Sequence, residues 1–194
     1  MTMERLPATI SLDGTDYALR AMTAEDKAAI LAFAKSLPAH DLLFLTRDIT
    51  KRRVVDAWID QTDSGAIETV VAEQDGRLVG CSALITDPLS WSPHLGELRV
   101  LVDPAARQHG LGRVLIEQCF GKALDKGLKK LTAQMTVDQK GAITLFEELG
   151  FRGEALLRDH VRDAEDTLHD IVILACDVDR ATSQLEAYGM SEGS

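Results

Sequence analysis

Long hydrophobic runs are absent from this sequence. No apolar stretch approaches the roughly 20 residues that a membrane-spanning helix needs. The first ten residues, MTMERLPATI, lack both the basic start and the apolar segment of a secretory signal. We therefore expect a cytoplasmic protein without a membrane partner. The 194 residues are enough to bury the core of one domain.

Basic residues are scarce. The chain has 21 Lys and Arg residues against 31 Asp and Glu residues, which gives a net charge of −10. Binding to the phosphate backbone of a nucleic acid needs a basic face, so we expect no nucleic-acid partner. The acidic balance weakly favours a cationic ligand such as an amine, through long-range attraction.

Cysteine is rare and follows no pattern. Cys81, Cys119 and Cys176 all lie in apolar runs and have no metal-ligand spacing. We interpret them as small buried hydrophobic residues in a reducing compartment, with a cysteine nucleophile as the alternative. The His and Asp residues of segment 160–170 also match no known ligand spacing, so no metal site is expected.

The hydrophobic pattern predicts an α/β fold. Helical periodicity appears in four segments, which are 23–37 (opened by the capping-box sequence TAED), 50–61, 111–126 and 142–149. In the second segment the predicted apolar face holds Val54, Ala57, Trp58 and Gln61. Strand signals appear on both sides of Asp13-Gly14 and in segments 66–74, 77–86, 95–102, 128–137, 151–161 and 167–178.

This order of elements predicts a mixed sheet. Hairpin connections come first and should give antiparallel pairs, whereas the later helices should connect parallel strands. We expect residues 1–178 to form a single domain and residues 179–194 to form a C-terminal tail that is partly disordered.

A glycine-containing segment, RQHGLGRVL (residues 107–115), follows the apolar run that ends at Val102. It is not a P-loop, because Gly112 is followed by Arg-Val where Lys-Ser/Thr is required. It does not fit a Rossmann fingerprint either, because Leu115 stands at the third glycine position and the loop from Val102 to Gly110 is too long.

An anion-binding nest fits the segment better. Backbone N–H groups at a helix start converge there, and side chains are absent at Gly110 and Gly112. The helix dipole together with Arg107 and Arg113 favours a pyrophosphate. The alternative is a plain turn flanked by solvated arginines.

The surroundings of this segment resemble the GNAT superfamily of N-acyltransferases. Residues 102–112, VDPAARQHGLG, are similar to the family pattern V-x-x-Pro-x-x followed by Arg/Gln-x-x-Gly-x-Gly/Ala. Residues 142–151, AITLFEELGF, resemble the family's closing helix with its Gly-Phe end. The resemblance covers residues 17–178. Leu19-Arg20 with Asp26 is also similar to the start of the GNAT domains of bacterial protein-lysine acetyltransferases.

The resemblance implies a GNAT fold, with a mixed central sheet, a splayed strand pair and helices on both faces. It also implies acetyl-coenzyme A as cosubstrate, with the pantetheine beside strand 95–102 as a pseudo-strand. That strand is expected to be bulged, and an N–H near Val100 or Leu101 is expected to polarise the thioester carbonyl. The implied coenzyme-binding residues are Val100, Leu101, Val102, Arg107, Gln108, His109, Gly110, Leu111, Gly112, Arg113, Gln139 and Phe146.

The implied reaction is acetyl transfer to a primary amine of a small molecule or of a protein lysine. A lysine-like amine has a pKa near ~10.4, so it must lose a proton before it can react. Glu97 is the candidate base, acting through water, and an exposed or salt-bridged strand glutamate without a catalytic role is the alternative. Strand alternation puts Glu97, Arg99 and Leu101 on one face, but a bulge would break this parity.

Three residues depart from the family pattern. Phe146 replaces the usual tyrosine acid, which a thiol leaving group tolerates. Gln108 replaces a glycine, which is tolerable if its φ is negative. Gln139 replaces an asparagine. The missing tyrosine and the missing asparagine leave open a second function, a coenzyme-A-binding sensor with little catalysis. The identity of the amine acceptor, the choice between acetyl and a longer acyl group, and the presence of a homodimer also stay open.

Overall fold

The structure is a computed structural model that describes residues 6–181. Its strands are β1 (Ala8–Leu12), β2 (Thr15–Ala21), β3 (Ile67–Gln74), β4 (Arg77–Thr86), β5 (Leu95–Val102), β6 (Lys130–Thr136), β7 (Arg152–Arg162) and β8 (Leu168–Asp177). Its helices are α1 (Lys27–Ser36), α2 (Arg52–Asp63), α3 (Leu111–Asp125) and α4 (Lys140–Glu148), with the 3₁₀ turns η1 (Ala24–Asp26), η2 (Ala39–Leu42) and η3 (Pro104–Ala106).

The strands form one mixed sheet in the order β1-β2-β3-β4-β5-β6-β8-β7. β5 and β6, which α3 connects, pair in parallel as predicted. β6 and β7, which α4 connects, run in the same direction, but β8 lies between them and pairs antiparallel with both. The predicted α/β fold with a mixed sheet is confirmed, although the second crossover makes no parallel pair.

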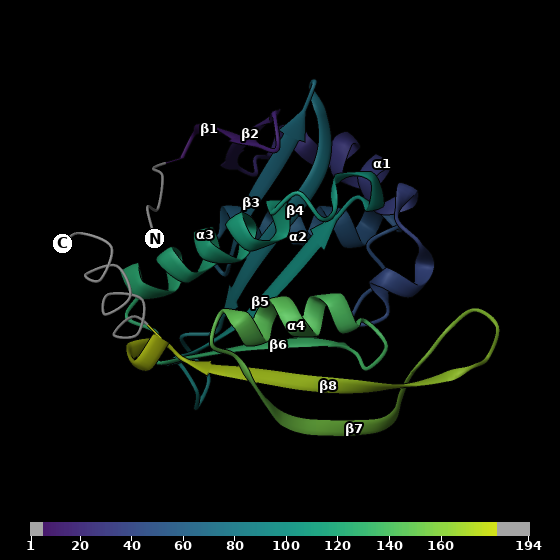
Figure 1. Cartoon of the computed structure of the whole chain (residues 1–194), viewed down its shortest axis with the longest axis vertical. Coiled ribbons are helices and arrows are strands. Elements are labelled where there is room, and N and C mark those ends of the chain that lie inside the picture. The colour runs from purple at the N-terminus through teal and green to yellow at the C-terminus, as the bar shows by residue number, and fades with distance from the viewer. Residues whose placement is uncertain (1–5, 182–194) are drawn as a thin grey trace.

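Helices cover both faces of the sheet, as predicted (Figure 1). α3 and α4 pack on one face, where Ile116 and Phe146 belong to the same apolar cluster as Leu98 of β5. α1 and α2 pack on the other face, where Phe33 belongs to a cluster with Leu101. Successive residues of β5 therefore face opposite layers.

The apolar residues that repeat with helical spacing in α1 and in α3 are buried. They are Ile30, Phe33, Ala34 and Leu37 in and after α1, and Leu111, Leu115, Cys119 and Ala123 in α3. The helix α2 differs. Its deepest residues are Val55 and Ile59, whereas the predicted Val54 and Trp58 are only half-buried. The reason is that Val54 and Trp58 border an apolar pocket instead of closed core. The domain limits stay predictions, since residues 1–5 and 182–194 lie outside the described residues.

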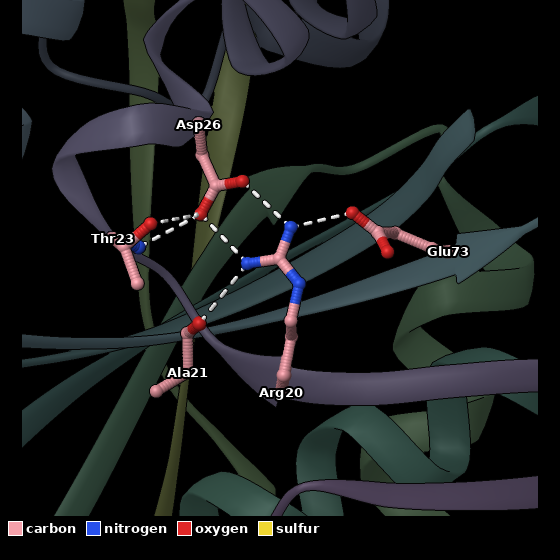
Figure 2. Close-up of polar contacts among 5 residues, drawn as sticks. All are labelled: Arg20, Ala21, Thr23, Asp26 and Glu73. Carbon is pink, nitrogen blue, oxygen red and sulfur yellow. Dashed lines mark hydrogen bonds and ion pairs between the residues drawn. The ribbon is translucent and has the colours of Figure 1, made fainter. Parts of the chain in front are cut away.

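The Arg20 and Asp26 pair fastens the start of α1 to the sheet (Figure 2). Arg20 donates from both terminal nitrogens to Asp26, at 2.8 and 2.6 Å, and also to Glu73 of β3 at 2.5 Å. The Asp26 carboxylate accepts a third bond from the Thr23 N–H at 2.7 Å. The Leu-Arg and Asp motif of the sequence therefore has a structural role away from the cleft described below.

Candidate active site

A cleft opens where β5 and β6 separate. The two strands pair only from Leu95↔Lys130 to Glu97↔Thr132, although β5 continues to Val102 and β6 to Thr136 (Figure 1). Beyond Glu97, the edge of β5 that faces β6 has no neighbouring strand. The splayed pair that the sequence resemblance implied is present.

The prediction of a bulge in β5 is wrong. The register of β5 with β4 is regular from Gly80↔Val102 to Thr86↔Gly96, and the irregularity in this region lies between β3 and β4, at Ala72/Glu73. The cleft arises because β6 diverges and not because β5 buckles. Strand alternation along β5 is therefore unbroken.

Unbroken alternation decides which N–H of β5 faces the cleft. The Asp103 N–H donates to the Val79 carbonyl at 2.8 Å, so the polar groups of Asp103 face β4. Polar groups along a strand alternate between its two edges. The N–H of Leu101 therefore turns toward β4, and the N–H of Val100 turns into the cleft. Of the two residues predicted to polarise a carbonyl, the geometry favours Val100.

Unpaired N–H groups collect at the start of α3. The backbone N–H groups of residues 108–113 donate to no carbonyl in the part of the chain that the structure describes. Gly110 precedes the helix with a φ of +86°, a conformation that glycine adopts without steric cost. α3 is 15 residues long, so its dipole adds positive potential at the same point. This arrangement suits an anion.

The backbone of Gln108 contradicts the sequence-based expectation of a negative φ. Its φ is +67°, in the left-handed region. The chain thus keeps the conformation that glycine would give this loop, but with a side chain attached. Such a conformation costs a non-glycine residue about 1–2 kcal/mol.

The basic side chains of this loop are paired with carboxylates. Arg107 donates to the Val102 carbonyl at 3.0 and 3.1 Å and to Asp41 at 2.5 Å. Arg113 is paired with Glu148. The His109 ring lies 3.2 Å from an oxygen of Asp13. These carboxylates offset part of the positive charge of the loop's side chains, so the backbone N–H groups of residues 108–113 are its main unpaired donors among the described residues.

The cleft has a volume of about 690 Å³. Ligand sites of small molecules and cofactors have volumes of about 300–1,000 Å³. Ten predicted coenzyme-binding residues line it, and the remaining two, His109 and Leu111, do not. The ten lining residues are Val100, Leu101, Val102, Arg107, Gln108, Gly110, Gly112, Arg113, Gln139 and Phe146.

Gln139 and Phe146 reach the cleft from α4. Gln139 precedes the helix, and its side-chain oxygen accepts from the Thr136 N–H at 3.3 Å. Phe146 is 5% exposed and packs edge-on against Phe151, with the ring centroids 5.0 Å apart. Phe146 therefore belongs to the core and to the cleft wall at once.

Glu97 lies on the opposite face of β5 and does not line the cleft. Its carboxylate accepts from Arg99 Nε at 2.7 Å, and both side chains are about one-fifth exposed. The salt-bridged state, the alternative considered for this residue, is the one observed. Glu97 is the last residue of β5 that pairs with β6, so its backbone marks the point where the two strands part.

Two residues of η2 line the cleft although they were not among the predicted site residues; the family resemblance implied only that the segment they open lies over the acceptor side. His40 Nε2 lies 2.7 Å from Asp138, just after β6, and Asp41 binds Arg107, just after β5. Burial raises the pKa of Asp138, but hydrogen bonds from Thr136 and its own backbone, with the charge of His40, lower it by more. η2 thus joins both arms of the cleft. No local motif marks it, because its partners are distant in sequence.

The cysteines are buried and free. Burial raises the pKa of Cys81 and of Cys119 to about 12, and that of Cys176 to about 11. Thiols with such pKa values are poor nucleophiles at neutral pH. This agrees with their interpretation as small hydrophobic residues.

No helix among residues 6–181 is long and apolar enough to cross a membrane. Within the same residues, no three His, Cys, Asp or Glu side chains are grouped so that they could hold a metal ion.

Comparison with known proteins identifies the family. Two curated relatives are a mycothiol acetyltransferase from Thermomonospora curvata and the [ribosomal protein bS18]-alanine N-acetyltransferase of Escherichia coli. They are 32% identical over 109 residues and 33% identical over 76 residues. The matches cover 55% and 39% of this chain, and 33% and 51% of those proteins, respectively.

A solved structure shares the fold. It is a phosphinothricin acetyltransferase from Sinorhizobium meliloti in complex with acetyl-coenzyme A, with a TM-score of 0.70 and 17% identity, covering 83% of this chain and 88% of that one. The model of the Acetyltransferase (GNAT) family matches residues 30–151. The chain therefore belongs to the GNAT acetyltransferase family.

Proposed function

We propose that the protein is an acetyl-coenzyme A-dependent N-acetyltransferase that acts on a primary amine of a small molecule or of a protein lysine. The proposal is carried by one observation: the free edge of β5 and the unpaired N–H groups of residues 108–113 border the same cleft. The cytoplasmic location and the homodimer considered from the sequence stay predictions.

The cleft offers each part of the donor a matching surface. The N–H groups of residues 108–113 suit the two phosphates, because they are fixed donors at a helix start. The open edge of β5 suits the amides of the pantetheine, by the hydrogen bonding that strand addition uses. The acetyl-coenzyme A of the structurally similar phosphinothricin acetyltransferase supports this assignment.

The transfer needs few protein groups. The amine nitrogen attacks the thioester carbon, a C–N bond forms, and the carbonyl oxygen takes the negative charge. The N–H of Val100 is the proposed donor to that oxygen. Glu97, through water, is the proposed acceptor of the amine proton. To accept it, the Glu97 carboxylate must weaken its ion pair with Arg99. The C–S bond breaks, and solvent protonates the thiolate, since Phe146 has no proton to give.

A coenzyme-A-binding sensor with little catalysis is the second candidate. Two observations favour it: Phe146 occupies the position of the usual acid, and Glu97 is engaged by Arg99. The sensor would use the same cleft but would not need an acceptor site.

Calorimetry with coenzyme A and thiol release with an amine panel separate the two candidates. We expect the enzyme to bind coenzyme A and to release thiol. Glu97→Gln should lower kcat about 10²-fold and leave coenzyme A affinity unchanged. The matched control is Glu154→Gln, an exposed strand glutamate paired with Lys130, which should change neither quantity.

Binding without turnover across the panel would support the sensor. Absence of coenzyme A affinity would contradict both candidates.

A further inference from the structure

A second pocket lies on the other face of β5, under α2. Its volume is about 60 Å³, and its walls are apolar for the most part. Trp58 and Val54 of α2 form one wall, and Ala83 and Ile85 of β4 form another. Leu101 lines both this pocket and the large cleft, so the two spaces adjoin at this residue of β5.

Charged groups stand at the rim of this pocket. Arg47 and Arg99 both line it. Arg99 holds Glu97 at 2.7 Å, two residues away on the same face of the strand. Arg47 is exposed and forms no hydrogen bond or ion pair with another described residue. Two guanidinium groups therefore line a mostly apolar pocket, and one of them, that of Arg99, also binds the Glu97 carboxylate.

We infer that the acceptor is a free α-amino acid with a short, branched aliphatic side chain, of which leucine is the type. This inference rests on the proposed function and specifies its acceptor. The side chain fills the pocket under α2, the carboxylate binds Arg99 and Arg47, and the ammonium group lies against Glu97. The Glu97–Arg99 pair thus matches the two opposite charges of the amino acid.

The pocket volume decides the size of the side chain. One water needs about 10–15 Å³ of a cavity, and a cavity of about 150 Å³ holds benzene. A pocket of about 60 Å³ therefore favours a short side chain of three or four carbon atoms over an aromatic ring. The apolar walls disfavour the ammonium end of a lysine side chain or a polyamine, which would lose its hydration there.

The arginines decide between a free amino acid and a peptide N-terminus. A peptide presents an amide next to its terminal residue, and an amide carries no charge for Arg47 and Arg99. Arginine binds a carboxylate through charge-assisted hydrogen bonds, often as a bidentate pair. The negative net charge of the chain favours cations at long range, but these two arginines set the local sign at the rim.

A substrate panel tests the inference with the full chain and acetyl-coenzyme A. Thiol release is measured with leucine, with leucinamide and isoamylamine, which lack the carboxylate, and with phenylalanine and lysine. We expect kcat/KM to be highest for leucine and about 10- to 100-fold lower for leucinamide and isoamylamine. Equal or higher values for lysine or phenylalanine would overturn the inference.

Two variants test the contacts one at a time. Ala83→Leu fills the pocket and should raise the KM for leucine about tenfold or more while the affinity for coenzyme A persists, which also reports that the variant is folded. Arg47→Gln should remove most of the preference for leucine over leucinamide. Arg53→Gln, an exposed arginine of α2 outside the pocket, should retain that preference. An Arg47→Gln preference equal to that of Arg53→Gln would overturn the carboxylate contact.

A binding measurement separates this inference from the transferase assignment. Calorimetric titration of leucine into the complex with coenzyme A measures the affinity of the pocket for leucine without any turnover. If no amine is acetylated and leucine still binds in a manner that Ala83→Leu abolishes, the transferase assignment is wrong and the pocket assignment stands. If other amines are acetylated and leucine does not bind, the inference is wrong and the activity stands.

Discussion

Gln108 combines a side chain with a backbone conformation that favours glycine. Its φ is +67°, and it lies in the loop that leads into α3. We expect Gln108→Gly to raise the free energy of unfolding by about 0.5–1 kcal/mol, because relief of the left-handed strain exceeds the added entropy of the unfolded chain. Denaturant unfolding measures this change.

Gln61 supplies a matched control for that substitution. It is exposed in α2 and has no positive φ, so Gln61→Gly should lower the free energy of unfolding by about 1 kcal/mol. A loss of stability in Gln108→Gly would show that the side chain of Gln108 stabilises the loop by more than the strain costs.

For individual residues, the sequence predicted backbone conformation better than it predicted which partners the side chains bind. The pattern in residues 102–112 indicated where unpaired backbone N–H groups lie at the start of a helix, because glycine positions report backbone shape. It did not indicate that Arg107 is bound to Asp41, since that contact joins residues 66 positions apart. The pairing of Glu97 was considered but not decided, because it depended on a bulge that is absent.

At the scale of elements, local periodicity was sufficient for most of the fold. The apolar residues of α3 predicted its buried face, since Leu111, Leu115, Cys119 and Ala123 are all essentially inaccessible. The position of β8 between β6 and β7 was not predicted, because hairpin and crossover signals specify connections and not strand order. η2 carries no periodic signal, so its bridge across the cleft depends on tertiary contacts alone.

Gly96 lies where β5 still pairs with β6 and where three leucines converge. A Cβ at this position would approach Leu84 and Leu128 to 2.8 Å and Leu131 to 3.0 Å. These leucines are buried and have little room to move. We expect Gly96→Ala to lower the free energy of unfolding by about 1–3 kcal/mol, as overpacking of a core does. Thermal and denaturant unfolding measure the loss.

The control for Gly96 is Gly153 of β7. A Cβ there would meet nothing within 4 Å, so Gly153→Ala should keep or slightly raise stability. Equal effects of the two substitutions would show that the loss reflects glycine's backbone freedom instead of packing at the base of the cleft.

At the scale of the whole molecule, several carboxylates have pKa values below their ordinary range. The hydrogen bond from Arg20 lowers the pKa of Asp26. Burial raises the pKa of Glu68, but Lys122 and Lys126 together lower it by more. A carboxylate with a lowered pKa in the folded state contributes stability that is present above its unfolded pKa of about 4 and is lost as the pH falls toward its folded pKa. We therefore expect a stability plateau at neutral pH and a decline below about pH 4.

Asp26 should account for a measurable part of that decline. Asp26→Asn leaves Arg20 without its two-bond partner, so it should lower the free energy of unfolding by about 1–3 kcal/mol at pH 7. The difference from the unmodified protein should shrink as the pH falls, because acid also discharges Asp26 there. Asp60→Asn, an exposed change in α2, should leave both the plateau and the slope as they are. A difference for Asp26→Asn that persists unchanged at pH 3 would show that the asparagine disturbs packing, and that the ion pair of Figure 2 contributes little to the stability of this end of the sheet.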